Sequence, residues 1–182
     1  MHDPLAIRLT GYVPEKPHPK QHAFLTLNCR EAFFGGAAGG GKTAAELMAA
    51  LQYVDVPGYS AVILRKTHAQ LAKADSVLHQ AHRWLQGTDA RWTGSKNRYT
   101  FPSGATLEFG HLQHPNDKYN YQGAAFQFVG FDELTQFLEE EYRYLFSRLR
   151  KPADGALAGV PLRMRSASNP GGMGHLWVRS SF

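Results

Sequence analysis

Short runs of apolar residues alternate with helical patterns along most of the chain. Runs rich in β-branched and aromatic residues predict strands, and spacings of three and four between apolar residues predict helices. The predicted strands cover residues 31–34, 60–64, 126–131 and 162–166, and the predicted helices cover residues 44–54, 67–85 and 135–150. Because strands that alternate with helices form a mainly parallel central sheet flanked by helices, the pattern predicts an α/β fold with functional residues at the carboxyl ends of the strands.

Two segments depart from this alternation. Residues 92–109 contain NRYTF and ATLEFG on either side of Pro-Ser-Gly, which predicts an inserted β-hairpin. Prolines at positions 4, 14, 17 and 19 are incompatible with a helix interior, so residues 1–20 are predicted to form an extended N-terminal arm. Residues 21–182 are then expected to form a single domain.

The composition fits one folded domain. The chain has 182 residues, of which 43% are apolar, and this is enough for a hydrophobic core and excludes disorder as the main state. The sequence has no secretion signal and no apolar run of membrane length, so we expect a cytoplasmic protein that is neither secreted nor membrane-bound. The single cysteine, Cys29, excludes an internal disulfide framework and is expected to be a small buried residue. The net charge of +5 permits a polyanionic partner without requiring one.

A glycine-rich segment between the first predicted strand and the first predicted helix matches the pattern G-x-x-x-x-G-K-[ST] of a phosphate-binding loop. The loop residues are Gly36, Ala37, Ala38, Gly39, Gly40, Gly41, Lys42 and Thr43. Small residues let several backbone N–H groups approach phosphate oxygens together, and the helix N-terminus adds partial positive charge. Lys42 is expected to reach the β and γ phosphates of ATP, and the Thr43 hydroxyl to bind Mg²⁺.

An acidic pair follows the strand predicted at residues 126–131. Asp132 is expected to hold Mg²⁺ through its water shell, and Glu133 to polarise the attacking water. Its place after an apolar strand, 90 residues after Lys42, supports this assignment. The presence of a glutamate as well as an aspartate favours hydrolysis of ATP by water over a small-molecule kinase or a switch GTPase.

Beyond these motifs, the chain resembles the ATPase domain of the large terminase subunit, the DNA-packaging motor of tailed bacteriophages. The resemblance rests on PKQHAFL, GGAAGGGKT, LRKTHAQL, NRYTFPSGATLEFG, DKYNYQGAAFQFVGFDELTQF and SASNPGG, which together cover nearly the whole chain. It implies that Gln21 binds the adenine edge and that Ser168 and Asn169 sense the γ-phosphate and couple hydrolysis to DNA movement. The implied fold is a P-loop NTPase of the additional-strand type.

The resemblance also implies partners. These are double-stranded DNA, a portal protein, a small terminase subunit and further copies of the chain in a ring on the portal, all in the host cytoplasm where virions assemble. Large terminases normally continue into a C-terminal nuclease with a carboxylate-bound metal pair, and no nuclease activity is expected from this chain. The acidic run at residues 139–141 is expected to be a solvated helix face.

The phosphate loop lacks the arginine that some terminases carry there, so an arginine finger must come from elsewhere. Such a finger contributes about 10³ to 10⁵ in rate in other nucleotide hydrolases. The candidates are Arg65, Arg148, Arg150 and Arg98, and Arg65 ranks first because it leaves a predicted strand at the active edge of the sheet. Contacts with DNA phosphates are open to six basic residues, for each of which a solvated surface position is an equal alternative. These residues are Lys66, Lys73, Arg91, Lys96, Arg98 and Lys118.

Several other interpretations compete with the packaging motor. A helicase-like DNA translocase shares the loop and the acidic pair, but it needs a second motor domain. A nucleotide-binding assembly module with negligible activity alone would also carry these motifs. The nine histidines lack the cysteine and carboxylate partners of a metal site. Tyr12 and Phe24 could stack on adenine, although core packing is the more usual role of such residues.

Overall fold

The computed structural model describes residues 7–37 and 41–182, and within them it shows a seven-stranded sheet. The strands are β1 (Glu31–Gly35), β2 (Ser60–Arg65), β3 (Arg91–Thr93), β4 (Arg98–Thr100), β5 (Thr106–His111), β6 (Phe128–Asp132) and β7 (Arg163–Ser168). Their order across the sheet is β1-β7-β6-β2-β5-β4-β3. The five strands from β1 to β5 in this order run parallel, and β4 and β3 are antiparallel to their neighbours. Strand β7 therefore lies between β1 and β6 as an additional strand.

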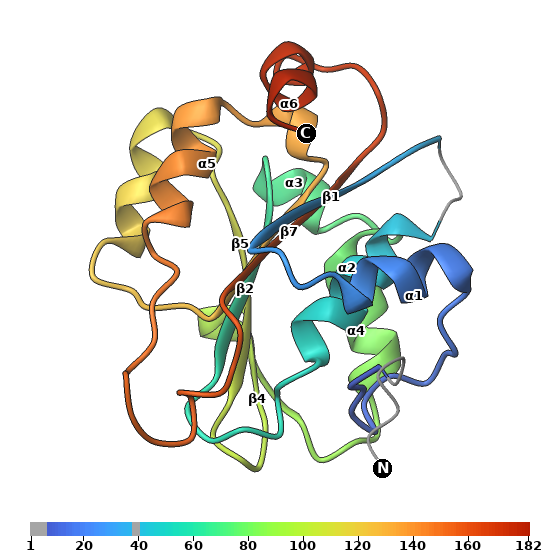
Figure 1. Cartoon of the computed structure of the whole chain (residues 1–182), viewed down its shortest axis with the longest axis vertical. Helices are drawn as coiled ribbons and strands as arrows, with labels where there is room; N and C mark the ends of the chain where they lie inside the picture. The colour runs from blue at the N-terminus through green and yellow to red at the C-terminus, as the bar shows by residue number, and fades with distance from the viewer. Residues whose placement is uncertain (1–6, 38–40) are drawn as a thin grey trace.

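Helices cover both faces of this sheet (Figure 1). The α-helices are α1 (Pro19–Thr26), α2 (Lys42–Leu51), α3 (His68–Leu71), α4 (Val77–Leu85), α5 (Glu139–Phe146) and α6 (His175–Ser181), and the 3₁₀ helices are η1 (Gly94–Lys96), η2 (Pro115–Tyr121) and η3 (Leu134–Gln136). Residues of α1, α2 and α4 belong to one buried apolar cluster, and residues of α5 and α6 belong to the other. The predicted mainly parallel sheet flanked by helices is confirmed.

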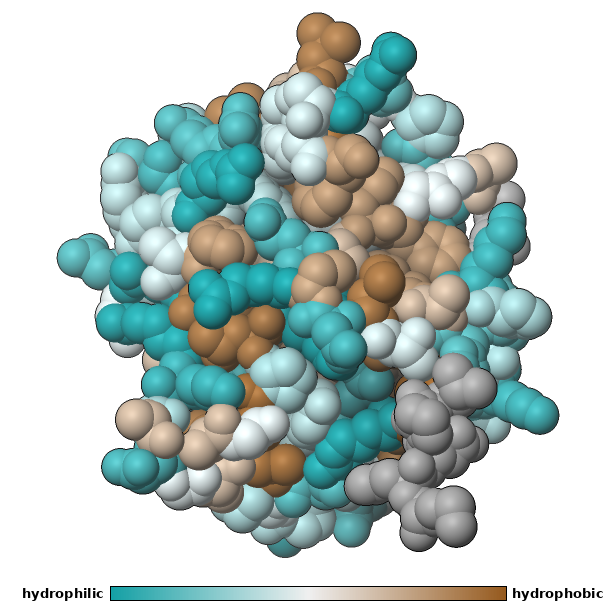
Figure 2. All heavy atoms as spheres, viewed as in Figure 1, coloured by the Kyte–Doolittle hydropathy of each residue, from teal (hydrophilic) through white to brown (hydrophobic). Residues whose placement is uncertain are grey.

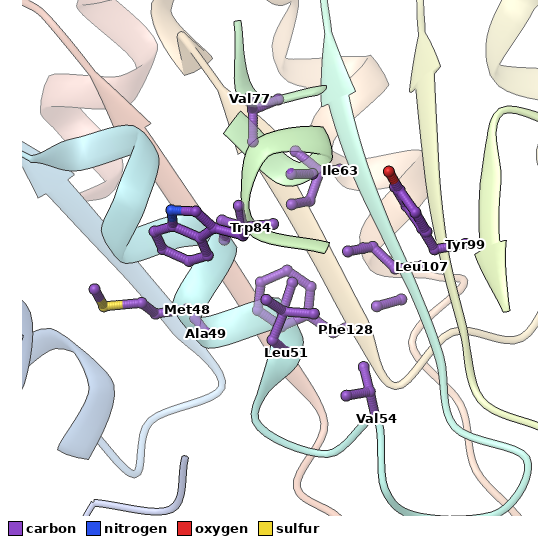
Figure 3. Close-up of a cluster of buried hydrophobic side chains, with 14 of the residues drawn as sticks. Met48, Ala49, Leu51, Val54, Ile63, Val77, Trp84, Tyr99, Leu107 and Phe128 are labelled. Carbon is purple, nitrogen blue, oxygen red and sulfur yellow. The ribbon is translucent and has the colours of Figure 1, made fainter. Parts of the chain in front are cut away.

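Strand β2 shows how the two clusters are separated. Its residues are buried on both sides, with Ala61 and Ile63 in the cluster under α2 and Val62 and Leu64 in the cluster under α5. Successive side chains of a strand point to opposite faces of the sheet, so a continuous apolar run is what a central strand requires. Figure 3 shows Ile63 among the buried side chains of the first cluster.

The predicted hairpin is present, whereas two predicted helices differ from the structure. Strands β4 and β5 do form a hairpin, but β5 also pairs in parallel with β2, so this segment extends the main sheet. The helix predicted over 67–85 is divided into α3 and α4, because the Ser76 hydroxyl accepts a hydrogen bond from the His79 backbone and starts a new helix. The helix predicted over 135–150 is shortened to α5, preceded by the separate turn η3.

The N-terminal segment is partly helical. Helix α1 begins at Pro19, two residues before the predicted start of the domain, because proline is tolerated at the first position of a helix. Before it, Ile7, Leu9, Tyr12 and Val13 are partly buried against the cluster under α2. The segment from residue 7 to residue 18 therefore packs on the domain.

Candidate functional site: the carboxyl edge of the parallel strands

The glycine-rich loop joins the end of β1 to the start of α2. Gly36 has a φ of 147° and Gly41 a φ of 71°, conformations that L-residues with a side chain rarely adopt. A Cβ at Gly41 would also lie 2.7 Å from Nε2 of Gln21. The predicted residues Ala38, Gly39 and Gly40 lie outside the described residues. Backbone conformation therefore favours glycine at both positions, and close packing adds to this at Gly41.

Lys42 begins α2, and its side chain is largely buried. Its Nζ donates a hydrogen bond of 2.6 Å to the carbonyl oxygen of Ala37, across the loop. Thr43 follows on the same first turn of the helix. The ammonium group is therefore held over the loop, where incoming phosphate oxygens could replace the Ala37 carbonyl as its acceptor.

The acidic pair lies at the carboxyl end of β6, two strands away from β1. Asp132 is the last residue of β6 and is buried. Burial, aided by the neighbouring Glu133, raises the pKa of Asp132 to about 6, although Arg65 and Lys42 act in the opposite direction. Because β1, β7 and β6 are parallel, Asp132 and the phosphate loop share one edge of the sheet.

Glu133 has an unusual backbone. Its φ of 59° and ψ of 56° lie in the left-handed region, which is uncommon for a residue other than glycine. Its Oε2 accepts hydrogen bonds from the Ser168 hydroxyl at 3.3 Å and from the Asn169 backbone at 3.4 Å. The left-handed turn thus accompanies contacts between the carboxylate of Glu133 and the end of β7.

Arg65 is the last residue of β2 and reaches the acidic pair. Its Nη1 lies 3.4 Å from Oδ2 of Asp132 and 4.0 Å from Oε1 of Glu133. Arg148 and Arg150, by contrast, bond through their backbone to Phe126, which precedes β6 at the opposite end of that strand. A strand of five residues spans about 17 Å. These two arginines are therefore far from the acidic pair of the same chain, while Arg98 on β4 pairs in register with Glu108.

Ser168 and Asn169 meet the acidic pair from β7. The Ser168 hydroxyl lies 2.8 Å from the hydroxyl of Thr135, a residue that the sequence analysis did not select. The Oδ1 atom of Asn169 is buried without a partner among the described residues. The structure thus places both predicted coupling residues next to Glu133.

Gln21 touches the loop from α1. Its side chain accepts a hydrogen bond from the His18 backbone at 3.1 Å and donates one of 2.9 Å to the carbonyl oxygen of Gly41. The predicted adenine-binding residue is therefore adjacent to the phosphate loop, with its amide engaged by protein groups. Phe24 is buried against Phe34, and Tyr12 packs on Phe101, so both have the packing role.

A cavity of about 720 Å³ opens beside the start of the loop. Gly36, Ala37, Ser168 and Asn169 line one part, and Phe33 and Phe182 line another. Figure 2 shows apolar residues gathered on this face, between α6 and α1. The cavity provides space next to the residues predicted to contact the nucleotide.

Glu46 on α2 is another residue of this region, besides Thr135, that the sequence analysis missed. It is fully buried, and its carboxyl faces Gly130 of β6. Glutamate is a common helix former, so position 46 itself carries no signal. The glycine inside a strand does carry one, because it indicates close approach of another group.

One expectation about other side chains holds only in part, and another is wrong. Glu139 and Glu140 are exposed, but Glu141 is buried, because Nζ of Lys66 lies 2.8 Å from its Oε1 and the Leu138 backbone donates to it. Lys66, proposed above for DNA contact, is therefore occupied by this ion pair. Cys29 is exposed rather than buried, because it lies in the loop before β1.

Neither a metal cluster nor a membrane-spanning helix is found in the part of the chain that the structure describes. No group of three or more histidine, cysteine, aspartate or glutamate residues there is arranged to hold a metal ion. Across residues 7–37 and 41–182, none of the helices combines the length and apolar character needed to cross a membrane.

Solved structures of phage terminases are similar to this chain. The HK97 bacteriophage large terminase matches with a TM-score of 0.67 and 14% identity, over 92% of this chain and 37% of that chain. The ATPase domain of the Thermus phage P74-26 large terminase matches with a TM-score of 0.64 and 17% identity, over 92% of this chain and 72% of that one. The large terminase of a thermophilic bacteriophage, in complex with ATP-gamma-S, matches with a TM-score of 0.58 and 18% identity, over 78% of this chain and 33% of that chain. At such identities the likeness establishes a shared P-loop NTPase-like fold.

The matches differ in how much of each chain they cover. The chain spans little more than a third of the length of the HK97 large terminase, 37%. No curated protein matches the sequence closely enough to count as a relative. The family described as "Terminase large subunit, T4likevirus-type, N-terminal" matches residues 33–156, which is more than half of the chain and contains the loop and the acidic pair. The chain therefore belongs to this family of terminase large subunit N-terminal domains.

Proposed function

We propose that this chain is the ATPase portion of a motor that drives viral double-stranded DNA into a procapsid. The observation that carries the proposal is the convergence of Lys42, Arg65, Asp132 and Glu133 at one edge of the parallel strands. Family membership supports it, as does the large terminase of the thermophilic bacteriophage, which has been solved with ADP and with ATP-gamma-S.

Mg²⁺ fits the side chains of this edge. The Thr43 hydroxyl and the Asp132 carboxylate supply oxygen ligands, which this ion prefers. The buried carboxyl of Glu46 has no partner among the described residues, and burial together with Asp132 raises its pKa well above the usual value. When bound, the ion would neutralise charge on the phosphates and on the leaving group.

Each residue at the site would then have a separate role in ATP binding and hydrolysis. Lys42 would exchange its bond to the Ala37 carbonyl for the β and γ phosphates, and Gln21 would contact the adenine edge. Glu133 would orient the attacking water, because its carboxylate is already fixed by Ser168 and the Asn169 backbone. The same hydrogen bonds would pass the change at the γ-phosphate to β7, which gives Ser168 and Asn169 their coupling role.

Arg65 is proposed to stabilise charge on the transferred phosphoryl group. Its guanidinium already lies within 4.0 Å of both members of the acidic pair. In a ring on a portal, with a small terminase subunit that selects DNA, neighbouring chains could supply further basic groups. If neighbouring chains supply such groups, turnover by one chain alone should be weak.

Two substitutions test the proposal. Glu133→Gln should preserve ATP binding and abolish hydrolysis, because the amide cannot polarise the water. Lys42→Ala should weaken nucleotide binding itself, because the phosphates lose their cation. Binding is measured with a fluorescent ATP analogue, and turnover by phosphate release with and without DNA and portal protein. Normal turnover in the first variant would disprove the role of Glu133, and unchanged affinity in the second would show that the loop is not the site.

A further inference from the structure

Glu46 is a buried carboxyl group with no hydrogen-bond partner among the described residues. Its side chain is 0% exposed, and both carboxyl oxygens lack a partner there. It follows Lys42 by four positions and Thr43 by three, so all three residues lie on one side of α2. An unpartnered buried polar group destabilises a fold, and its presence beside the phosphate loop calls for a role in another state of the protein.

The opposite strand makes room for this carboxyl. A Cβ at Gly130 would lie 2.6 Å from Oε1 of Glu46, closer than any side chain permits. The same Cβ would approach Phe128 and Ile63, which Figure 3 shows on the face of the sheet that α2 covers. Gly130 precedes Asp132 by two positions on β6, so the two residues face the same side of the sheet. Glu46 therefore points at the side of the sheet that carries Asp132.

Arg65 lies on the same face of the sheet as Gly130, because Ile63 pairs in register with Gly130 and Arg65 follows Ile63 by two positions on β2. Arg65 acts on the pKa of Glu46 in the direction that favours ionisation, while burial, Asp132 and Glu133 raise that pKa. The Nε atom of Arg65 is buried and has no partner among the described residues, while Nη1 lies against Asp132. An unsatisfied donor on Arg65 and unsatisfied acceptors on Glu46 thus lie over the same face of the sheet as Asp132.

We propose that Glu46 is a positioning residue that holds Arg65 once Asp132 is engaged by the metal of a bound nucleotide. A divalent cation at Asp132 competes with Arg65 for the carboxylate and repels its guanidinium. Glu46 then accepts the Nε–H of Arg65 and keeps the guanidinium beside the phosphates instead of releasing it toward solvent. This inference rests on the proposed function, and it adds a residue outside the glycine-rich loop and the acidic pair.

The proposal predicts opposite effects on the empty and the loaded protein. Glu46→Met has a similar length and no polar atoms, so in the nucleotide-free protein it should leave the urea midpoint of unfolding unchanged or raise it. In Mg²⁺ the same variant should bind a non-hydrolysable ATP analogue about 10- to 100-fold more weakly, the range expected for a lost charge-assisted hydrogen bond. With EDTA in place of Mg²⁺, wild type and variant should bind the analogue equally.

A second variant and a second background separate this role from a merely structural one. Glu46→Gln keeps an acceptor and should retain part of the affinity that Glu46→Met loses. In an Arg65→Ala background, neither substitution should weaken binding further, because their effect acts through Arg65. Glu108→Gln, at a partly buried carboxyl of β5 outside the site, is the matched control and should leave affinity unchanged.

Each alternative outcome is informative. A lower urea midpoint of Glu46→Met with unchanged affinity in Mg²⁺ would assign Glu46 to structure alone and overturn the proposal. The proposal would also be overturned if the Glu46 variants lost as much affinity in EDTA as in Mg²⁺, or as much in the Arg65→Ala background as in the wild-type background. If Lys42→Ala weakens binding and the Glu46 variants do not, only this inference fails. If Lys42→Ala has no effect either, the proposed function fails and the inference falls with it.

Discussion

The buried carboxylate of Asp132 should lower the free energy of unfolding of the nucleotide-free protein, and the substitution Asp132→Asn measures by how much. The ordinary pKa of this carboxyl is 3.8, and its environment raises the pKa to about 6. Each pKa unit corresponds to about 1.4 kcal/mol, so the ionised form costs the folded state about 3 kcal/mol. The side chain is only 5% exposed, which leaves little screening by solvent.

The sign of the pH dependence follows from this direction. Because the folded state holds the proton of Asp132 more tightly than the unfolded state, stability is lost as the pH rises from about 4 to about 6 and stays lower above that. An asparagine at this position would carry no such penalty. The substitution should therefore stabilise the nucleotide-free protein by about 3 kcal/mol at pH 8, by about half of that at pH 5, and by only about 0.5 kcal/mol at pH 4.

The assay is urea unfolding of wild type and Asp132→Asn in EDTA at the three pH values. The difference between the values at pH 8 and pH 4 is the informative quantity, because any effect of the amide that does not depend on pH cancels. A destabilisation at pH 8, or a difference that does not change with pH, would refute the reasoning. The variant should also lose the Mg²⁺ dependence of nucleotide binding.

Two further predictions concern groups away from the loop. Lys66→Met should destabilise the fold by about 3–5 kcal/mol, because it leaves the carboxyl of Glu141, which is 1% exposed, without its cation. In urea unfolding, the double variant Lys66→Met with Glu141→Leu should regain most of the lost stability. No regain would mean that the ion pair is not the cause. The exposed thiol of Cys29 should react with a thiol reagent in the native protein at a rate close to that in denaturant, and strong protection would contradict its exposure.

The central strands could be predicted from the sequence because a strand that is buried on both faces has a continuous run of apolar residues. Residues 61–64 form an apolar run typical of a strand covered on both faces, and the glycine loop with its lysine is a local pattern. The division between α3 and α4 could not be predicted in this way, because apolar spacing continues through it. There a single hydroxyl, that of Ser76, decides where the second helix begins.

The least predictable parts of the site depend on contacts between distant segments. Glu46 on α2 is buried against Gly130 of β6. Glu141 on α5 is buried by Lys66, which follows β2. Neither glutamate differs in its local sequence from an exposed helical one. Burial of a charged residue is set by what the other segment offers, and a pattern read along one helix does not contain that information.

The left-handed turn at Glu133 has a consequence for directed evolution of this domain. Glycine and asparagine adopt that conformation more readily, and a residue held there against its preference costs about 1–3 kcal/mol. A library screened only for survival of heating would therefore gather these two residues at position 133. Its winners would be well folded and would lack the carboxylate, so a screen on this scaffold has to score turnover alongside thermal tolerance.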